Sequence, residues 1–402
     1  MFKLENFRGI ISDKEIVNIY HKAKKLQGKS IVNLNATYQG GGVAEILYSL
    51  VLLMNDIGID TEWRVLNGSS EFFNITKNFH NALQGAEFNF TDSKKKSYLQ
   101  TNDNFSKFTK LNHDCIIIHD PQPLSLINSY KKQQPWIWRC HIDLTNPHSL
   151  LWNFLKNFIF KYDKVIFSSE KYKKDDLYVD QKIISPAINP LNYKNCEMGN
   201  EEIKKYIEQA GIPTDKPIIT QVSRLDPWKD PEGVIEVYKT IKEKIDCRLL
   251  FCYNVASDDP ETIRMYNKVA NSAQKYIDNN DIVMVVGDDD RLVNAIQRFS
   301  DVIIQKSTRE GFCLCVTEAL WKGTPVVASN VGGIPIQIED GVNGYLLEPK
   351  DINGFAEKII YMLKNKKDLA EMGKQAKESV RKNFLITRLL KNYLDIIKES
   401  LD

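Results

Sequence analysis

The sequence STREGFCLCVTEALWKG, residues 307–323, sets the local fold around which the rest of the chain is read. An apolar strand pattern at 301–305 precedes it, and apolar residues at helical spacing follow from Val316. A turn beginning with Gly311 joins the two. A strand, a turn and a helix start leave backbone N–H groups at the helix N-terminus, where they and the helix dipole favour a bound phosphate. The stretch predicts an anion site formed by the backbone near Leu314, Cys315 and Val316.

Two glutamates, Glu310 and Glu318, lie eight residues apart in this stretch. We place Glu310 on the loop and Glu318 about one turn inside the helix. One carboxylate can accept hydrogen bonds from a ribose and the other from a hexose, with a diphosphate between them on the helix end. This arrangement suits a nucleotide-sugar. The alternative is an ordinary strand, loop and helix with two solvated acids.

A second charged cluster follows the strand pattern at 218–222, in the sequence SRLDPWKDP. Arg224 and Lys229 lie five residues apart across a proline turn. Two cations held at a strand end can neutralise a leaving diphosphate. The alternative is a pair of exposed basic residues on a loop.

The first half of the chain also has a glycine loop between a strand and a helix. Gly40, Gly41 and Gly42 separate the strand at 30–34 from a helix at 43–55, which is again the geometry of a phosphate cradle. The dinucleotide fingerprint would require glycine at position 45, where this chain has Glu45. The sequence therefore disfavours nicotinamide binding.

Polar residues follow two strands of this half, at 115–118 and 135–141. Asp120 and Gln122 follow the first, and Arg139, His141 and Asp143 lie at the end of the second. Ligands of open parallel sheets bind at the carboxyl ends of the strands, so these side chains face the expected site. A lone histidine at a strand end is usually structural, and its spacing alone does not assign His141 a function.

Length and composition bound the class of protein. The chain has 402 residues, which suggests two or three domains, and its 43% hydrophobic and 26% charged content is that of a globular chain. The formal net charge of +2 gives no reason to expect a nucleic-acid partner. Seven scattered cysteines without metal-ligand spacing indicate buried, reduced thiols in the cytoplasm. No apolar run is long enough to span a membrane.

Strand and helix patterns alternate through both halves, which predicts an α/β protein with two doubly wound parallel sheets. Two prolines within residues 186–190 mark a linker. We expect domains at 1–187 and 188–382, with 383–402 as a final helix.

The stretch 307–323, with Glu310 and Glu318 eight residues apart, resembles the E-x7-E element of family 4 retaining glycosyltransferases. Beyond it, the runs NATYQGGGVAEIL, GIDTEWRV, HDPQPL and PWIWRCHIDL resemble the trehalose glycosyltransferring synthases, so that the likeness covers nearly the whole chain. The resemblance implies the GT-B architecture, in which two Rossmann-like domains face a cleft and the C-terminal helix crosses back to the first domain. It also implies transfer of glucose, with retention, from a nucleoside diphosphate glucose to free glucose, giving trehalose.

The same resemblance assigns roles to individual residues. The first domain would take the acceptor and the second the nucleotide-sugar, with Asp288 beside the nucleobase and His141 beside the donor sugar. The catalytic set is His141, Arg224, Lys229 and Glu310; the donor-binding set is Gly41, Gly42, Asp288, Gly311, Phe312, Leu314, Cys315, Val316 and Glu318; the acceptor set is Asp120, Gln122, Arg139 and Asp143. One departure is Cys313, where many family members have glycine after the phenylalanine.

The motifs require no covalently bound cofactor and no metal. They leave Mg²⁺ and a homodimer open, and the partners expected are small sugars and a nucleotide-sugar. Asp288, Asp289 and Asp290 are consecutive, but they precede a helix, where acids cap the N-terminus.

Four other functions compete with the synthase. They are a trehalose phosphorylase that uses free phosphate, a family 4 enzyme with another small sugar acceptor, a non-catalytic regulator that binds a sugar nucleotide, and a sugar-nucleotide epimerase.

Overall fold

The computed structural model describes residues 2–254 and 260–402 and divides into two compact units. Unit 1 comprises Met1–Ala187 together with Ile386–Asp402, and unit 2 comprises Ile188–Leu385. The first boundary falls inside the predicted linker. The second lies at 385/386, three residues after the predicted 382/383, because helix α12 continues to Asn383 before the chain turns.

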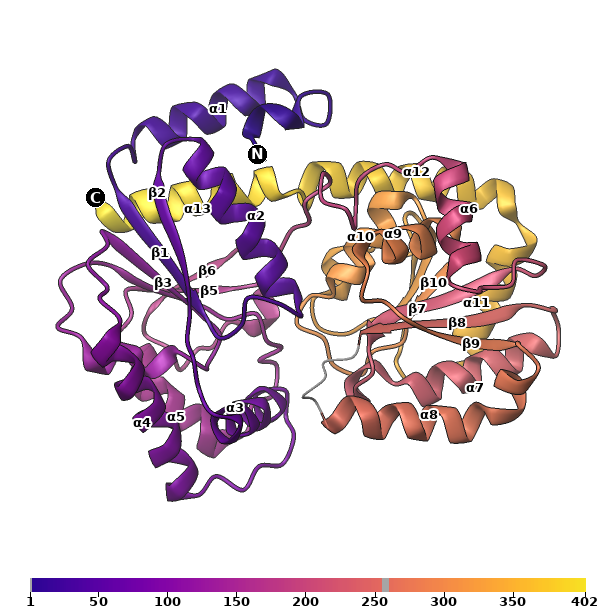
Figure 1. Cartoon of the computed structure of the whole chain (residues 1–402), viewed down its shortest axis with the longest axis horizontal. Coiled ribbons are helices and arrows are strands. Elements are labelled where there is room, and N and C mark those ends of the chain that lie inside the picture. The colour runs from indigo at the N-terminus through magenta and orange to yellow at the C-terminus, as the bar shows by residue number, and fades with distance from the viewer. Residues whose placement is uncertain (1, 255–259) are drawn as a thin grey trace. The chain divides into compact units, whose positions relative to one another are not determined.

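Unit 1 contains a parallel six-stranded sheet with helices on both faces (Figure 1). In spatial order the strands are β2 (Asp60–Val65), β1 (Ser30–Asn35), β3 (Cys115–His119), β4 (Trp136–Arg139), β5 (Lys164–Phe167) and β6 (Asp180–Ile183). One face carries α1 (Asp13–Lys24), α2 (Gly42–Asp56) and α13 (Ile386–Leu401); the other carries α3 (Ser70–Leu83), α4 (Asp92–Phe108) and α5 (Ser149–Ile159). Short 3₁₀ turns are η1 (Leu4–Phe7), η2 (Leu124–Ser129) and η3 (Glu170–Tyr172).

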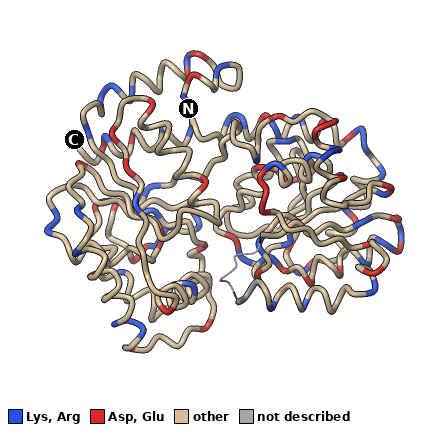
Figure 2. Tube along the Cα trace, viewed as in Figure 1, with Lys and Arg blue, Asp and Glu red and all other residues tan. Residues whose placement is uncertain are grey.

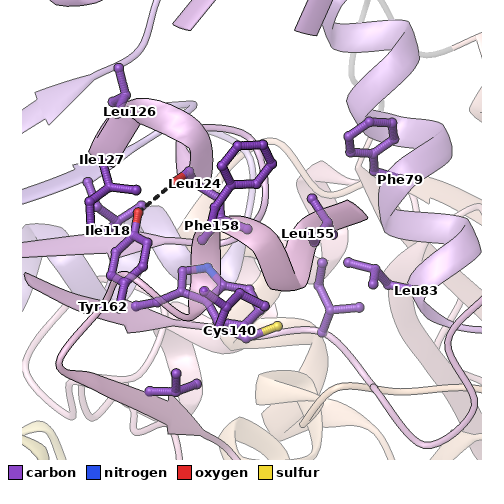
Figure 3. Packing of buried hydrophobic residues seen from close by; sticks show 14 of the residues in the cluster. Phe79, Leu83, Ile118, Leu124, Leu126, Ile127, Cys140, Leu155, Phe158 and Tyr162 are labelled. Carbon is purple, nitrogen blue, oxygen red and sulfur yellow. Dashed lines mark hydrogen bonds between the residues drawn. The ribbon is translucent and has the colours of Figure 1, made fainter. Parts of the chain in front are cut away.

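Alternation along the strands separates the two faces of this sheet. Apolar side chains such as Ile118 (Figure 3) and Trp138 pack with residues of α3, α4 and α5 in the main core of unit 1. Within that core the hydroxyl of Tyr162 donates to the carbonyl oxygen of Leu124 over 2.7 Å, which satisfies a buried polar group. The opposite face carries polar side chains such as Asn33 and His119, and these build the candidate site described below.

Unit 2 has a second parallel six-stranded sheet. In spatial order its strands are β12 (Tyr345–Leu347), β11 (Val326–Ser329), β10 (Val302–Gln305), β7 (Ile218–Arg224), β8 (Arg248–Asn254) and β9 (Ile282–Val286). Helices α6 (Asn200–Gln209), α9 (Asp290–Phe299), α10 (Leu314–Lys322) and α12 (Lys366–Asn383) lie on one side, and α7 (Pro231–Lys242), α8 (Pro260–Asp278) and α11 (Ile352–Lys364) on the other (Figure 1). Two 3₁₀ turns are η4 (Pro227–Lys229) and η5 (Ile334–Ile336).

Helix α13 is part of unit 1, although it ends the chain. Its apolar side buries Leu390, Tyr393 and Ile397, and ion pairs tie its polar side to the rest of the unit. Lys391 pairs with Glu15 at 2.8 Å. The predicted fold class, with two doubly wound parallel sheets, is confirmed.

Charges of both signs are mixed along both units, as Figure 2 shows. Within residues 2–254 and 260–402, none of the helices combines the length and the apolar character needed to cross a bilayer.

Candidate active site

The N-terminus of α10 lies just beyond the carboxyl end of β10, as predicted. Cys313 occupies the N-cap position with φ of 73°, a left-handed conformation that is uncommon for any residue except glycine. Its side chain makes no capping hydrogen bond among the described residues, whereas Ser12 caps α1 and Asp230 caps α7. An uncapped helix N-terminus at this edge of a parallel sheet can receive an anion.

Two loops of unit 2 are joined beside this helix start. The ammonium of Lys229 donates to the carboxylate of Glu310. The backbone N–H of Thr308 donates to the carbonyl oxygen of Trp228 over 2.8 Å. The sequence thus correctly indicated both loops, and the structure adds that their charged residues contact each other.

The electrostatics of these loops keep Lys229 charged. Burial by itself lowers the pKa of the Lys229 ammonium, but the neighbouring Glu310 and Asp226 outweigh burial and raise that pKa above its ordinary value. Arg224, at the end of β7, keeps 44% of its side chain exposed and contacts Asp226 at 3.2 Å. One cation is therefore held in place, and the other is accessible to a ligand.

Glu318 lies inside α10 and only 2% of it is exposed. The Nε2 of Gln297 donates to its carboxylate over 3.4 Å, and the ammonium of Lys194 lies 4.0 Å away. Asp288 lies on the turn before α9, while Asp289 caps that helix by accepting from the N–H of Arg291 over 2.8 Å. The expectation that an acid of this turn caps a helix is confirmed for Asp289.

Two residues outside the predicted site, Gly333 and Gln337, support the loop at Gly311 and Phe312. A Cβ added to Gly333 would lie 2.6 Å from the carbonyl oxygen of Gly311 and 2.7 Å from Cα of Phe312. Buried Gln337 donates from Nε2 to the carbonyl oxygen of Phe312, and its Oε1 accepts from the hydroxyl of Thr317 over 2.5 Å. No spacing in the sequence pointed to Gln337 as a support of this loop.

In unit 1, Asp120 begins the polar edge of the sheet. It follows β3 with φ of 62°, which Asp and Asn tolerate better than other non-glycine residues. Its Oδ1 accepts from the backbone N–H of His141 over 2.8 Å, and its carbonyl oxygen accepts from Nε1 of Trp138 over 3.0 Å. Burial raises the pKa of the Asp120 carboxyl to about 7, so this group changes charge near neutral pH.

His141 follows β4 and is partly exposed. Its Nε2 lies 3.1 Å from Nδ1 of His119, and the two rings are stacked with 5.4 Å between their centroids. Nε2 of His119 lies 3.0 Å from Oδ1 of Asn33 on β1. Sequence reasoning selected His141 but missed His119 and Asn33, although His119 stands beside Asp120 in the sequence.

The remaining predicted acceptor residues have local partners. Arg139 is 1% exposed and donates to the carbonyl oxygen of Phe167 over 3.1 Å. Asp143 is 2% exposed and accepts from the N–H and the hydroxyl of Thr145, which closes a turn. Gln122 is partly exposed. Direct contact with an acceptor stays a prediction for all three, and burial favours it least for Arg139 and Asp143.

The glycine loop of unit 1 precedes α2. Gly41 is the N-cap with φ of 168°, an extended conformation open to any residue, and Gly42 begins the helix. Within the described residues, a Cβ on Gly41 would meet no atom within 4 Å. Neither backbone conformation nor packing among the described residues requires a glycine here, and the role of Gly41 in donor binding stays a prediction.

Comparisons with known proteins identify the family and the fold. A family model described as trehalose synthase, N-terminal domain, matches residues 33–174, and one described as glycosyl transferases group 1 matches residues 202–379. A trehalose synthase from Pyrococcus horikoshii is 48% identical over 399 residues, which is 98% of this chain and 96% of that protein. A trehalose phosphorylase from Grifola frondosa is 30% identical over 81% of this chain and 51% of its own length.

Among solved structures, an α,α-trehalose-phosphate synthase (UDP-forming) from Burkholderia xenovorans, in complex with glucose-6-phosphate, matches with a TM-score of 0.76 at 12% identity. The match covers 92% of this chain and 100% of that one and concerns the fold alone. With a relative that is 48% identical over nearly its full length, the chain belongs to the trehalose synthase family and is a glycosyltransferase with the GT-B fold.

Proposed function

We propose that this protein transfers glucose, with retention, from a nucleoside diphosphate glucose to free glucose and so produces trehalose. The observation that carries the proposal is the charged site of unit 2. Lys229 and Glu310 contact each other beside an α10 N-terminus that no side chain caps among the described residues, and Arg224 ends the neighbouring strand β7. Fixed cations and backbone N–H groups suit a diphosphate, and the adjoining carboxylates suit sugar hydroxyls.

The transfer step places its greatest charge on the leaving diphosphate. The bond between the anomeric carbon and the diphosphate oxygen breaks, and its electron pair stays on that oxygen. Lys229, Arg224 and the α10 N-terminus stabilise this charge because they are positioned before it develops. Glu318 accepts hydrogen bonds from the ribose, and Gly311 and Phe312 bring the loop backbone next to the sugar.

The new bond forms between the same carbon and a hydroxyl oxygen of the acceptor glucose. The hydroxyl proton passes to an oxygen of the departing diphosphate, so the step needs no protein nucleophile. His141 contacts the donor sugar, and Asp120 with Gln122 binds the acceptor hydroxyls. We also place the enzyme in the cytoplasm, where its seven free cysteines stay reduced.

Product analysis tests the reaction directly. The protein is incubated with glucose and, in separate reactions, with ADP-, UDP- and GDP-glucose, each with Mg²⁺ and with a chelator instead. We expect trehalose and the matching nucleoside diphosphate in equal amounts with at least one donor. Release of free glucose without trehalose, or no turnover of any donor, would overturn the proposal. The paired reactions also measure whether a metal ion contributes.

Two variants test the donor site. Arg224→Ala should lower turnover by about a hundredfold or more, because it removes a preorganised cation at the leaving group. Glu318→Ala should weaken nucleotide binding in calorimetry by about tenfold, the effect of roughly one hydrogen bond to a charged group. Arg381→Ala is the matched control, since Arg381 is exposed on α12 and forms a surface ion pair with Glu378. Normal turnover in Arg224→Ala would remove it from the mechanism.

The main alternative function is that of a trehalose phosphorylase, because the Grifola frondosa enzyme of that kind is 30% identical to this chain. The same cations would then hold free phosphate. Trehalose formed from glucose 1-phosphate and glucose, without any from nucleotide-sugars, would support that rival. Trehalose from nucleotide-sugars alone excludes it, and a changed sugar without a second sugar would indicate an epimerase.

A further inference from the structure

The polar row in unit 1 crosses three neighbouring strands. Asn33 lies on β1, His119 ends β3 and His141 follows β4, and these strands are adjacent in the sheet order. Asn33 and His119 point to the face opposite the main core, since their neighbours Val32, Leu34 and Ile118 point into it. They are 0% and 1% exposed. Buried polar side chains require partners: Oδ1 of Asn33 lies 3.0 Å from Nε2 of His119, whereas Nδ2 of Asn33 has no partner among the described residues.

The hydrogen bonds couple the tautomers of both rings. Oδ1 of Asn33 can only accept, so Nε2 of His119 carries a proton and donates to it. Nδ1 of His119 then holds a lone pair, because a neutral imidazole has one N–H. Nε2 of His141, 3.1 Å away, must therefore donate to that lone pair. The other ring nitrogen of His141, Nδ1, is left with a lone pair.

We propose that His119, held by Asn33, is a positioning residue that fixes the ring orientation and the tautomer of His141. His141 then offers Nδ1 to a hydroxyl of the donor sugar as a hydrogen-bond acceptor. This second statement depends on the proposed glucosyl transfer, in which His141 contacts the donor. The first statement concerns the row alone and stands without it.

Burial, with the nearby Arg139 guanidinium as the second cause, keeps the two histidines neutral. Burial and the nearby Arg139 guanidinium lower the pKa of His119 to about 3, and burial, Arg139 and His119 lower the pKa of His141 below its ordinary range. Among the described residues, Asp120 accepts from the backbone of His141, and Tyr393 and Arg388 of α13 interact with Arg139. A neutral row at pH 5 to 8 can hold one tautomer.

Two amide substitutions at His119 separate its two contacts. The amide of asparagine occupies the place of Nδ1, so His119→Asn can still accept from His141 but loses Asn33. The amide of glutamine occupies the place of Nε2, so His119→Gln keeps Asn33 but loses His141. Both variants remove the same ring and leave a neutral polar side chain. A purely structural role for His119 would therefore affect them alike.

Kinetics should separate the pair. We expect kcat of His119→Gln to fall about tenfold, the effect of roughly one hydrogen bond, with less than a twofold change in KM for the donor. For His119→Asn we expect a loss of less than about threefold. Urea midpoints of both variants are measured alongside. Equal losses in the two variants at equal stability, or a larger loss in His119→Asn, would overturn the positioning role.

The tautomer itself can be read without any activity. Long-range ¹⁵N–¹H spectra distinguish the two ring nitrogens, and the chain has six histidines, so His141→Phe identifies the signals of His141 by their absence. We expect Nε2–H for His141 in the wild type and in His119→Asn, and a tautomer mixture in His119→Gln. An Nδ1–H form in the wild type would overturn the inference. Absence of trehalose formation with this tautomer intact would instead overturn the proposed function.

Discussion

Different interactions hold the residues at the carboxyl edges of the two sheets. In unit 2 the edge consists of loops held together by charge: Lys229 contacts Glu310, and Arg224 keeps 44% of its side chain exposed. In unit 1 it is a row of side chains with little charge, in which Asn33 and His119 are at most 1% exposed and hydrogen-bond across strands. A site for a diphosphate needs fixed charge, whereas a site that orients a neutral sugar needs fixed geometry.

The largest expected effect comes from removing the charge in unit 2. Lys229→Ala leaves Glu310 largely buried without its cation, so turnover should fall about a thousandfold and the free energy of unfolding by about 3 kcal/mol. The double variant Lys229→Ala/Glu310→Ala should be more stable than Lys229→Ala, because it also removes the largely buried carboxylate whose cation was lost. Steady-state kinetics and urea unfolding measure both quantities.

Lys204→Ala is the matched control for this prediction, since the side chain of Lys204 is 61% exposed on α6. It should change neither turnover nor stability measurably. If Lys229→Ala behaved like Lys204→Ala, the charged edge of unit 2 would not be the basis of donor binding. The contrast between the two units would then fail.

A second test concerns the support of the donor loop rather than its charge. Gly333→Ala would place a Cβ 2.6 Å from the carbonyl oxygen of Gly311, so the loop must shift. We expect a loss of about 2 kcal/mol in stability and roughly tenfold weaker nucleotide binding by calorimetry. Gly199→Ala is the control, because a Cβ there would meet no described atom within 4 Å. Equal effects of the two substitutions would contradict the proposed support.

The sequence predicted the charged edge better than the neutral one. Glu310, Arg224 and Lys229 were identifiable because charged side chains that follow a strand and flank a glycine or proline turn are typical of anion sites. The alternating strand and helix patterns likewise predicted both sheets, although the return to unit 1 began at Ile386 and not at 383. These features depend on the spacing of residues that are close in the sequence, and such spacing can be read directly.

The partners that hold the site were not predictable in the same way. His119 contacts Asn33, which is 86 positions away in the sequence, and Gln337 contacts Phe312, which is 25 positions away. Both contacts depend on which strands and loops become neighbours, which no local pattern specifies. The burial of Arg139 was not predictable either, since a charged residue at a strand end gave no sign that its side chain is only 1% exposed.

The third prediction uses the pH dependence of stability to test whether the Asp120 carboxyl in unit 1 is uncharged in the folded state. The folded state holds the Asp120 proton up to about pH 7, whereas an unfolded carboxyl releases it near pH ~4. The folded state therefore binds more protons between these values, and its stability falls as pH rises through this window. Asp120→Asn keeps the acceptor for the N–H of His141 and tolerates φ of 62°, but it carries no charge.

Relative to the wild type, Asp120→Asn should therefore gain about 2 kcal/mol in unfolding free energy between pH 5 and pH 8. Urea unfolding at the two pH values measures this change. Asp143→Asn is the control, because Asp143 also ends a hydrogen-bonded turn in unit 1. A pH-independent difference between Asp120→Asn and the wild type would show that Asp120 is already ionised at pH 5, and charge would then matter at both edges.

The smallest expected effect concerns the residue at which the donor loop departs from its family. Cys313 has φ of 73°, which costs a residue with a Cβ about 1 kcal/mol, so Cys313→Gly should be more stable than Cys313→Ala by about that amount. Cys315, two residues on and inside α10, should show the opposite order, because alanine is the better helix former by about 1 kcal/mol. Thermal unfolding of the four variants measures both differences. If alanine were favoured at both positions, the left-handed start of α10 would be wrong, and the backbone N–H groups assigned to the diphosphate would point elsewhere.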